Sequence, residues 1–180
     1  EQMIRIGNLA GREVRCVLTP MDEPLGYSIG NNLEVIEAIN FLKGDMPKDL
    51  KEVVLELGAN MLQLAGKGEN IEENKLKILE NIENGNAYNK FVEMVKNQCG
   101  DISYIEDTTK FKKSKYTLAV VTKKTGKVTE INAEDIGRLA CYLGAGRVRK
   151  EDKIQHEVGI VLNKKVGDEV MTDDFLAYIC

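Results

Sequence analysis

The feature that most constrains this 180-residue chain is a glycine-punctuated loop that runs directly into an amphipathic helix, over residues 21–44. Its sequence is MDEPLGYSIGNNLEVIEAINFLKG. Glycine permits backbone conformations that turn carbonyl groups inward, and Glu37 on the helix adds a carboxylate. Carbonyl oxygens together with one carboxylate suit a hard cation. The segment therefore predicts a cation-binding loop.

Helical periodicity dominates the rest of the first half. Residues 1–8 predict the last turns of a helix, and residues 13–18 predict a strand, which together form the helix-to-strand step of a parallel sheet. We expect Asn31 or Asn32 to cap the helix that follows the loop, and Gly44 to end it. Apolar spacing predicts further helices over residues 47–65, 71–84 and 87–98.

A polar connector at residues 100–115 separates this helical half from a second region with a different pattern. Apolar alternation predicts strands at residues 116–122 and 128–131, joined by a hairpin turn at the Lys-Thr-Gly of residues 124–126. A helix over residues 133–143 and short strands within residues 158–179 complete the chain. We therefore predict two domains, residues 1–107 and 108–180.

Residues 144–147, Gly-Ala-Gly-Arg, superficially resemble a phosphate-binding loop. They follow a helix, however, whereas anions bind where a helix begins. We interpret Gly144 as a helix C-cap and expect Arg147 to pair with Asp152 or Glu151. His156, the only histidine, has no partner at a catalytic spacing and receives no role.

Composition excludes several classes of protein. A formal net charge of -4 argues against a nucleic-acid partner, and no apolar run is long enough to predict a membrane span. The four cysteines show no CxxC spacing, which fits a reducing cytoplasm better than a disulfide framework or a zinc site. The chain is expected to be globular and cytoplasmic.

Two long stretches of this sequence resemble the pyrimidine-nucleoside and thymidine phosphorylases. The first comprises PLGYSIGNNLEV at residues 24–35 and LELGA at residues 55–59. The second comprises INAEDIG at residues 131–137, LGAGR at 143–147, KED at 150–152 and VGIVL at 158–162. The resemblance implies an α/β fold: part of the large α/β phosphorylase domain, with strand, cation loop and helices, followed by an α+β C-terminal domain with a barrel-sandwich-like end.

The family implies a transferase that phosphorolyses pyrimidine nucleosides in salvage. Inorganic phosphate attacks the anomeric carbon of uridine, thymidine or deoxyuridine, which releases the base and a (deoxy)ribose 1-phosphate. The resemblance also implies a homodimer, no organic cofactor and a K⁺ site. Its ligands here would be the main-chain carbonyls of Leu25 and Ser28 and the side chain of Glu37.

The residues that hold phosphate and pyrimidine in this family have no equivalents in the chain. The family uses a loop rich in lysine, serine, glycine and threonine for phosphate, and an arginine, a serine and a lysine for the base. We therefore expect this sequence to be an internal fragment that is inactive alone, and we name no catalytic or substrate-binding residue.

An alternative function rests on the last segment, which resembles half of a biotinyl or lipoyl carrier barrel. In that alternative the chain is a non-catalytic carrier or scaffold module, with Lys164 or Lys165 modified. A carrier lysine sits at an exposed hairpin tip, whereas these lysines precede Val166, Gly167 and Asp168 in the turn-and-strand part of the motif. We therefore favour the phosphorylase.

Overall fold

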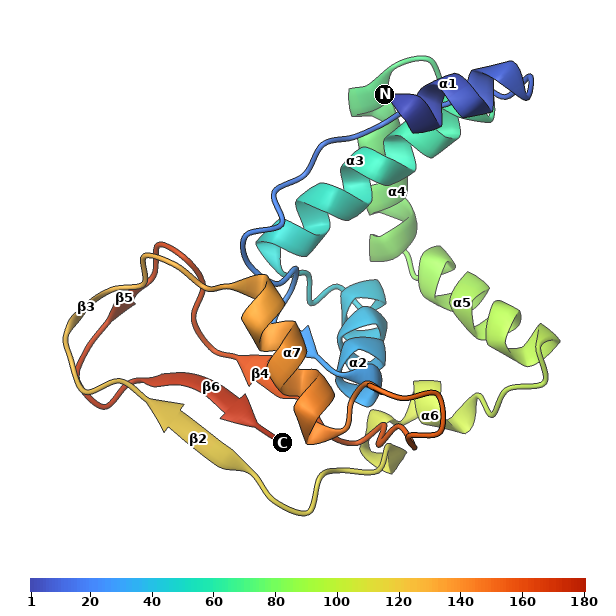
Figure 1. Ribbon diagram of the computed structural model, residues 1–180. Helices are drawn as coiled ribbons and strands as arrows, with labels where there is room; N and C mark the ends of the chain where they lie inside the picture. The colour runs from blue at the N-terminus through green and yellow to red at the C-terminus, as the bar shows by residue number, and fades with distance from the viewer.

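The computed structural model describes residues 1–180 and has a mixed α and β architecture, with most helices in the first half and most strands in the second (Figure 1). The helices are α1 (Gln2–Leu9), α2 (Asn31–Leu42), α3 (Lys48–Leu64), α4 (Ile71–Glu83), α5 (Asn86–Asn97), α6 (Ser103–Glu106) and α7 (Ala133–Leu143), with a 3-10 turn η1 (Thr108–Lys110). The strands are β1 (Ser28–Ile29), β2 (Leu118–Val121), β3 (Gly126–Lys127), β4 (Ile160–Leu162), β5 (Glu169–Val170) and β6 (Phe175–Ile179).

Four strands form one antiparallel sheet in the order β1-β4-β6-β2, and β3 pairs with β5 in a separate two-stranded sheet. Ser28 lies opposite Val161 in the β1–β4 pair. The sheet therefore joins a strand from the loop before α2 to the C-terminal unit, residues 108–180. This pairing fixes the loop against a part of the chain that is remote in sequence.

A small apolar core lies between α7 and the sheet. Its fully buried members are Ala140 of α7 with Ile160 and Leu162 of β4. Partly buried side chains pack around them: Tyr27, Ile29, Ile131, Ile136, Leu143, Ala145 and Ala177. Because Tyr27 and Ile29 belong to the loop before α2, burial of this core also holds the loop in place.

The helical arm, which consists of α3, α4 and α5, extends away from the sheet (Figure 1). Ala59 of α3 and Asn74 of α4 are completely buried between the two helices. The Asn74 amide donates to the Ala59 carbonyl at 3.3 Å and to the Gly68 carbonyl at 3.1 Å. The turn between α3 and α4 is therefore closed by a buried side chain.

All six predicted helices are confirmed, namely α1, α2, α3, α4, α5 and α7. The predicted C-cap of α7 is also confirmed, since Gly144 has φ +107°. The expected cap of α2 is wrong, because Gly30, with φ +140°, precedes the helix and no side chain caps it. The Asn31 amide instead donates to the Ala145 carbonyl at 2.7 Å, and that of Asn32 to the Lys112 carbonyl at 3.1 Å.

Two strand predictions are wrong. Residues 13–18 run without secondary structure, since no strand lies beside them to supply hydrogen bonds, and every strand pair in the structure is antiparallel. The predicted hairpin at residues 124–126 also fails, because β2 pairs with β6 and β3 pairs with β5. The apolar β6 offers β2 a longer partner than residues 128–131 do.

The predicted ion pair of Arg147 is wrong as well. Asp152 accepts instead from the backbone N–H groups of Val148 at 3.1 Å and Arg149 at 2.8 Å. These bonds close the turn locally and leave Arg147 without a carboxylate partner.

Candidate functional site

The glycine loop, residues 21–30, lies between the start of α3 and the C-terminal unit. Gly26 has φ +69°, and a Cβ added there would lie 2.4 Å from the Glu37 Oε2 atom. Only glycine combines this backbone conformation with so close an approach of a carboxylate. The sequence-predicted loop and its carboxylate are thus in direct contact.

Glu37 caps the backbone of the loop that precedes its own helix. Its Oε1 accepts from the Tyr27 N–H at 2.8 Å and its Oε2 from the Ser28 N–H at 3.4 Å. A carboxylate has about four lone-pair sites, so two donors leave capacity for a further ligand.

Asp49, at the start of α3, holds the other half of the loop. Its Oδ2 accepts from the Gly26 N–H at 2.9 Å, and its Oδ1 from the Leu50 N–H at 2.9 Å. Burial raises the pKa of this carboxyl, but hydrogen bonds from Lys165, Gly26 and Leu50 outweigh it and leave the pKa below its ordinary value.

Lys165 of the C-terminal unit completes this anchor. Its ammonium lies 2.8 Å from the Asp49 Oδ2, donates to the Pro24 carbonyl and stands 5.5 Å from the centroid of the Tyr27 ring. Tyr27 is partly buried there, and burial first, then the carboxylates of Asp168 and Asp49, raise the pKa of its hydroxyl. The phenol therefore stays neutral at physiological pH.

Backbone bonds from the C-terminal unit reach both ends of the glycine loop. The Leu162 N–H donates to the Tyr27 carbonyl at 2.7 Å, and the Val166 N–H donates to the Glu23 carboxylate at 3.0 Å. Together with the β1–β4 pair, these bonds place residues 160–166 alongside the loop.

The three predicted ligand residues surround one hollow of about 380 Å³. Its lining comprises Leu25, Ser28 and Glu37, with Pro24, Ile29, Glu34, Ala38 and Leu50. The Leu25 carbonyl accepts no hydrogen bond from the protein. The Ser28 N–H points to Glu37, so this side of the edge strand β1 faces away from β4.

These oxygen ligands fit a hard cation. A free carbonyl and a partly used carboxylate are oxygen ligands of the kind such ions take. No three His, Cys, Asp or Glu side chains gather into a metal-binding group anywhere in the chain. A cation here would thus depend on main-chain carbonyls and Glu37.

Sequence reasoning missed Asp49 and Lys165 as loop anchors. Asp49 lies in a segment whose apolar spacing predicts only a helix, residues 47–65, and Lys165 enters only the carrier alternative. The Lys165 and Pro24 partners are 141 residues apart, so no local spacing could reveal their contact.

The lysines proposed for a carrier are both engaged in ion pairs. The side chain of Lys165 is 12% exposed, and the Lys164 ammonium lies 3.2 Å from Asp174. A carrier lysine must project freely to swing a cofactor. This geometry does not favour the carrier alternative.

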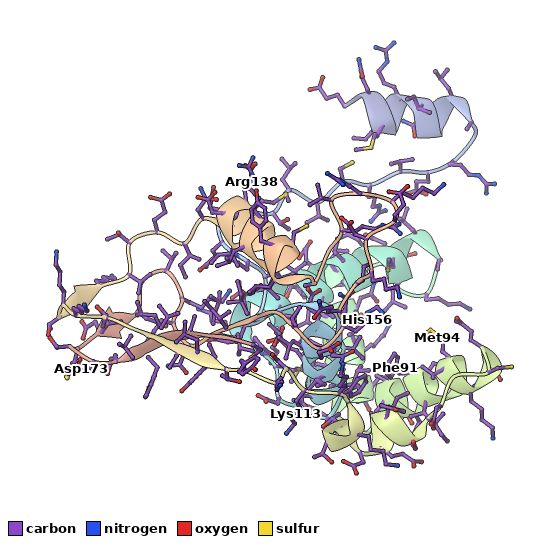
Figure 2. The ribbon with its side chains drawn as sticks, turned by 60° about the horizontal axis from the view of Figure 1, so that its bottom comes forward. Phe91, Met94, Lys113, Arg138, His156 and Asp173 are labelled. Carbon is purple, nitrogen blue, oxygen red and sulfur yellow. The ribbon has the colours of Figure 1, made fainter.

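His156 lies beside α2 (Figure 2). Its main-chain carbonyl accepts from the Asn32 N–H at 3.0 Å, so this residue helps to fix the first turn of that helix. Arg138, on α7, pairs with Glu134 one turn earlier at 2.5 Å.

Comparison with known proteins gives two family matches. Residues 1–88 match the model of the glycosyl transferase family a/b domain, and residues 127–179 match the pyrimidine nucleoside phosphorylase C-terminal domain. The first match includes the glycine loop, α2 and Asp49, and the second includes Lys165.

Similar full-length relatives carry one name. The pyrimidine-nucleoside phosphorylase of Bacillus subtilis strain 168 is 49% identical over 168 residues, which is 93% of this chain and 39% of that protein. The protein of the same name from Staphylococcus aureus strain USA300 is 46% identical over 177 residues, 98% of this chain and 41% of the relative. The chain thus spans about two fifths of the length of these relatives.

Helices long and apolar enough to cross a bilayer do not occur in the structure.

Proposed function

Because this chain belongs to the pyrimidine-nucleoside phosphorylase family, we propose that it forms part of an enzyme that phosphorolyses pyrimidine nucleosides. The substrates would be inorganic phosphate and a nucleoside such as uridine, thymidine or deoxyuridine. The products would be the free base and a (deoxy)ribose 1-phosphate. The names of the relatives and the two family matches support this assignment.

Within that enzyme we assign the glycine loop to a K⁺ site, with the Leu25 and Ser28 carbonyls and the Glu37 carboxylate as ligands. When bound, the ion supplies a fixed positive charge that favours the ordered form of a neighbouring phosphate-binding segment. The residues of this chain orient the oxygens: Gly26 lets the loop approach Glu37, and Glu37 holds the Tyr27 and Ser28 N–H groups.

One observation carries the assignment of the site. The three residues line the same hollow, and the Leu25 carbonyl within it has no hydrogen-bond donor from the protein. A main-chain carbonyl that accepts no hydrogen bond within the protein keeps its lone pairs for a cation.

Phosphate-dependent release of uracil from uridine by the full-length enzyme tests the activity. A K⁺ titration at constant ionic strength, with choline chloride as the replacement salt, tests the site. We expect Glu37→Gln to raise the K⁺ concentration for half-activation by at least about tenfold, because weakening a charged ligand costs on the order of 1.5–3 kcal/mol.

Glu34→Gln provides a matched control. Glu34 lines the same hollow one turn earlier on α2 and accepts from the Gly30 N–H at 3.0 Å, a bond that a glutamine oxygen can keep. Its K⁺ dependence should change less than that of Glu37→Gln, because this variant loses a charge near the site but no ligand. Equal K⁺ responses of the wild type and Glu37→Gln would refute the site, and absence of uracil release would refute the activity.

The remaining assignments are proposals from the family. We propose a cytoplasmic homodimer, with a barrel-sandwich-like arrangement in the C-terminal unit and no nucleic-acid or membrane partner. The four free cysteines are compatible with a reducing compartment. We expect the 180-residue chain alone to release no uracil, because we find no phosphate-binding or base-binding residues in it.

A further inference from the structure

We propose that Lys165 is a positioning residue of the glycine loop, through which the C-terminal unit sets the affinity of the loop for its cation. This inference rests on the proposed function, because it concerns the same K⁺ site. Lys165 does not line the hollow, so its effect on the cation would be exerted through the loop.

The contacts of the Lys165 ammonium group are made with residues in the N-terminal part of the chain. It pairs with Asp49 at 2.8 Å, donates to the Pro24 carbonyl and lies over the Tyr27 ring. Its side chain is 12% exposed. An ammonium that gives up so much water must be held by its partners, and here all of them belong to the glycine loop or directly support it.

The contacts of Lys165 bracket the Leu25 carbonyl. On one side, Lys165 binds the carbonyl of Pro24; on the other, it pairs with the Asp49 oxygen that accepts from the Gly26 N–H. The residues before and after Leu25 are therefore both fixed by the same ammonium group. Because a peptide unit is planar, fixing its neighbours limits the direction in which the Leu25 carbonyl can point.

Charge and positioning predict opposite effects of removing this lysine. A positive charge close to a cation site repels the cation, so loss of the charge alone would tighten K⁺ binding. Loss of positioning would instead let Pro24 and Gly26 move and would weaken K⁺ binding. We infer that positioning dominates, because the Lys165 charge is paired directly with Asp49.

Lys165→Met in the full-length enzyme tests the inference, with two readouts. The first is the rise in Tm on titration with K⁺ at constant ionic strength, which reports binding without turnover. The second is the K⁺ concentration for half-activation of uridine phosphorolysis, compared with kcat at saturating K⁺. We expect the Kd for K⁺ from the Tm titration and the K⁺ concentration for half-activation each to rise at least about fivefold, which is the lower end of the range for coupling between sites. Saturating K⁺ should restore most of kcat.

Lys164→Met is the matched control. The adjacent Lys164 contacts Asp174 at 3.2 Å and the Glu169 carbonyl at 3.1 Å, both within the C-terminal unit. This variant loses a lysine that is also largely covered, with a side chain 23% exposed, without touching the glycine loop, so its K⁺ dependence should equal that of the wild type. An equal loss of K⁺ affinity in both variants would overturn the proposal.

Asp49→Asn gives an independent variant should Lys165→Met not fold. The asparagine oxygen can still accept from the Gly26 N–H, but it no longer carries the charge that pairs with Lys165. We expect it to weaken K⁺ binding in the same direction, and the double variant to be less impaired than the two single effects combined.

The outcomes separate this inference from the proposed function. If Glu37→Gln weakens K⁺ binding but Lys165→Met leaves it unchanged or tighter, the positioning role is wrong and the K⁺ site stands. If the wild type shows no K⁺ response in either readout, the proposed site itself fails.

Discussion

The glycine loop and the helical arm are ordered by different kinds of interaction. In the arm, α3 and α4 pack along their length and close their turn through Asn74, whose partners at Ala59 and Gly68 lie nearby in sequence. The loop has little regular structure and depends on Glu37, Asp49 and Lys165. The helical scaffold is therefore held by contacts between residues close in sequence, whereas the candidate site is assembled by contacts between residues far apart in sequence.

The largest expected effect comes from filling a glycine where the loop meets the C-terminal unit. At Gly30, φ is +140° and a new Cβ would lie 2.6 Å from the Val158 carbonyl oxygen. Strain and overpacking together should make Gly30→Ala lose about 2–5 kcal/mol of unfolding free energy, measured by urea titration.

Gly66 in the arm is the control for this prediction. Its φ is +66°, and a Cβ there would meet no atom within 4 Å. Gly66→Ala should cost only the backbone strain, about 1–2 kcal/mol. Equal losses in the two variants would show that packing between the loop and the C-terminal unit is not tight.

A smaller effect distinguishes a capping asparagine from one that bonds across the chain. The Asn31 amide donates to the Ala145 carbonyl, whereas Asn70 caps α4 by accepting from the Glu72 and Glu73 N–H groups. Asn31→Asp removes a donor and should cost about 1 kcal/mol, whereas Asn70→Asp keeps the cap and should change the unfolding free energy by less than about 0.5 kcal/mol.

Chemical denaturation of the purified protein reports both values. A stable Asn31→Asp variant would mean that the contact to Ala145 contributes little.

A weaker effect should appear on the acid side of the stability profile. The pKa of Asp49 lies below its ordinary value of 3.8, so its stabilisation is complete above that value and is lost as the pH falls through the native pKa. Lys165 faces this carboxylate and Tyr27 lies close by. Between about pH 5 and about pH 2, Asp49→Asn should therefore lose stability less steeply than the wild type.

The measurement is the free energy of unfolding at each pH in the absence of K⁺. Parallel profiles for the wild type and Asp49→Asn would show that Asp49 has a similar pKa in the folded and unfolded chains.

The smallest effect is expected on the surface of the arm. Lys75 pairs with Glu56 at 2.7 Å and with Glu72 at 2.8 Å, and the hydrogen bond from Lys75 lowers the pKa of Glu56. Solvent screens such exposed pairs, so Glu56→Gln should leave Tm unchanged within experimental error. A clear fall in Tm would show that an ion pair between different helices also stabilises the arm, and the contrast between the arm and the glycine loop would then be weaker.

Sequence patterns predicted the helices well and the strands poorly. The helices α3, α4, α5 and α7 follow from apolar periodicity, because a helix makes its hydrogen bonds within its own segment. A strand needs a partner, and nothing local shows that residues 13–18 have none or that β2 pairs with β6. For the same reason, the local sequence does not show that the amide of Asn31 donates to the distant Ala145 carbonyl.

The sequence by itself determined the helical scaffold and the position of the glycine loop, because these features depend on residue types within short spans. The resemblance of the sequence to the pyrimidine-nucleoside phosphorylases supplied Leu25, Ser28 and Glu37 as candidate ligands. Only the tertiary structure decided that the three residues line one hollow and that Asp49 and Lys165 support the loop. Lys165 reaches Pro24 across 141 residues of sequence, and a contact between such distant residues forms only when packing of the whole chain brings them together.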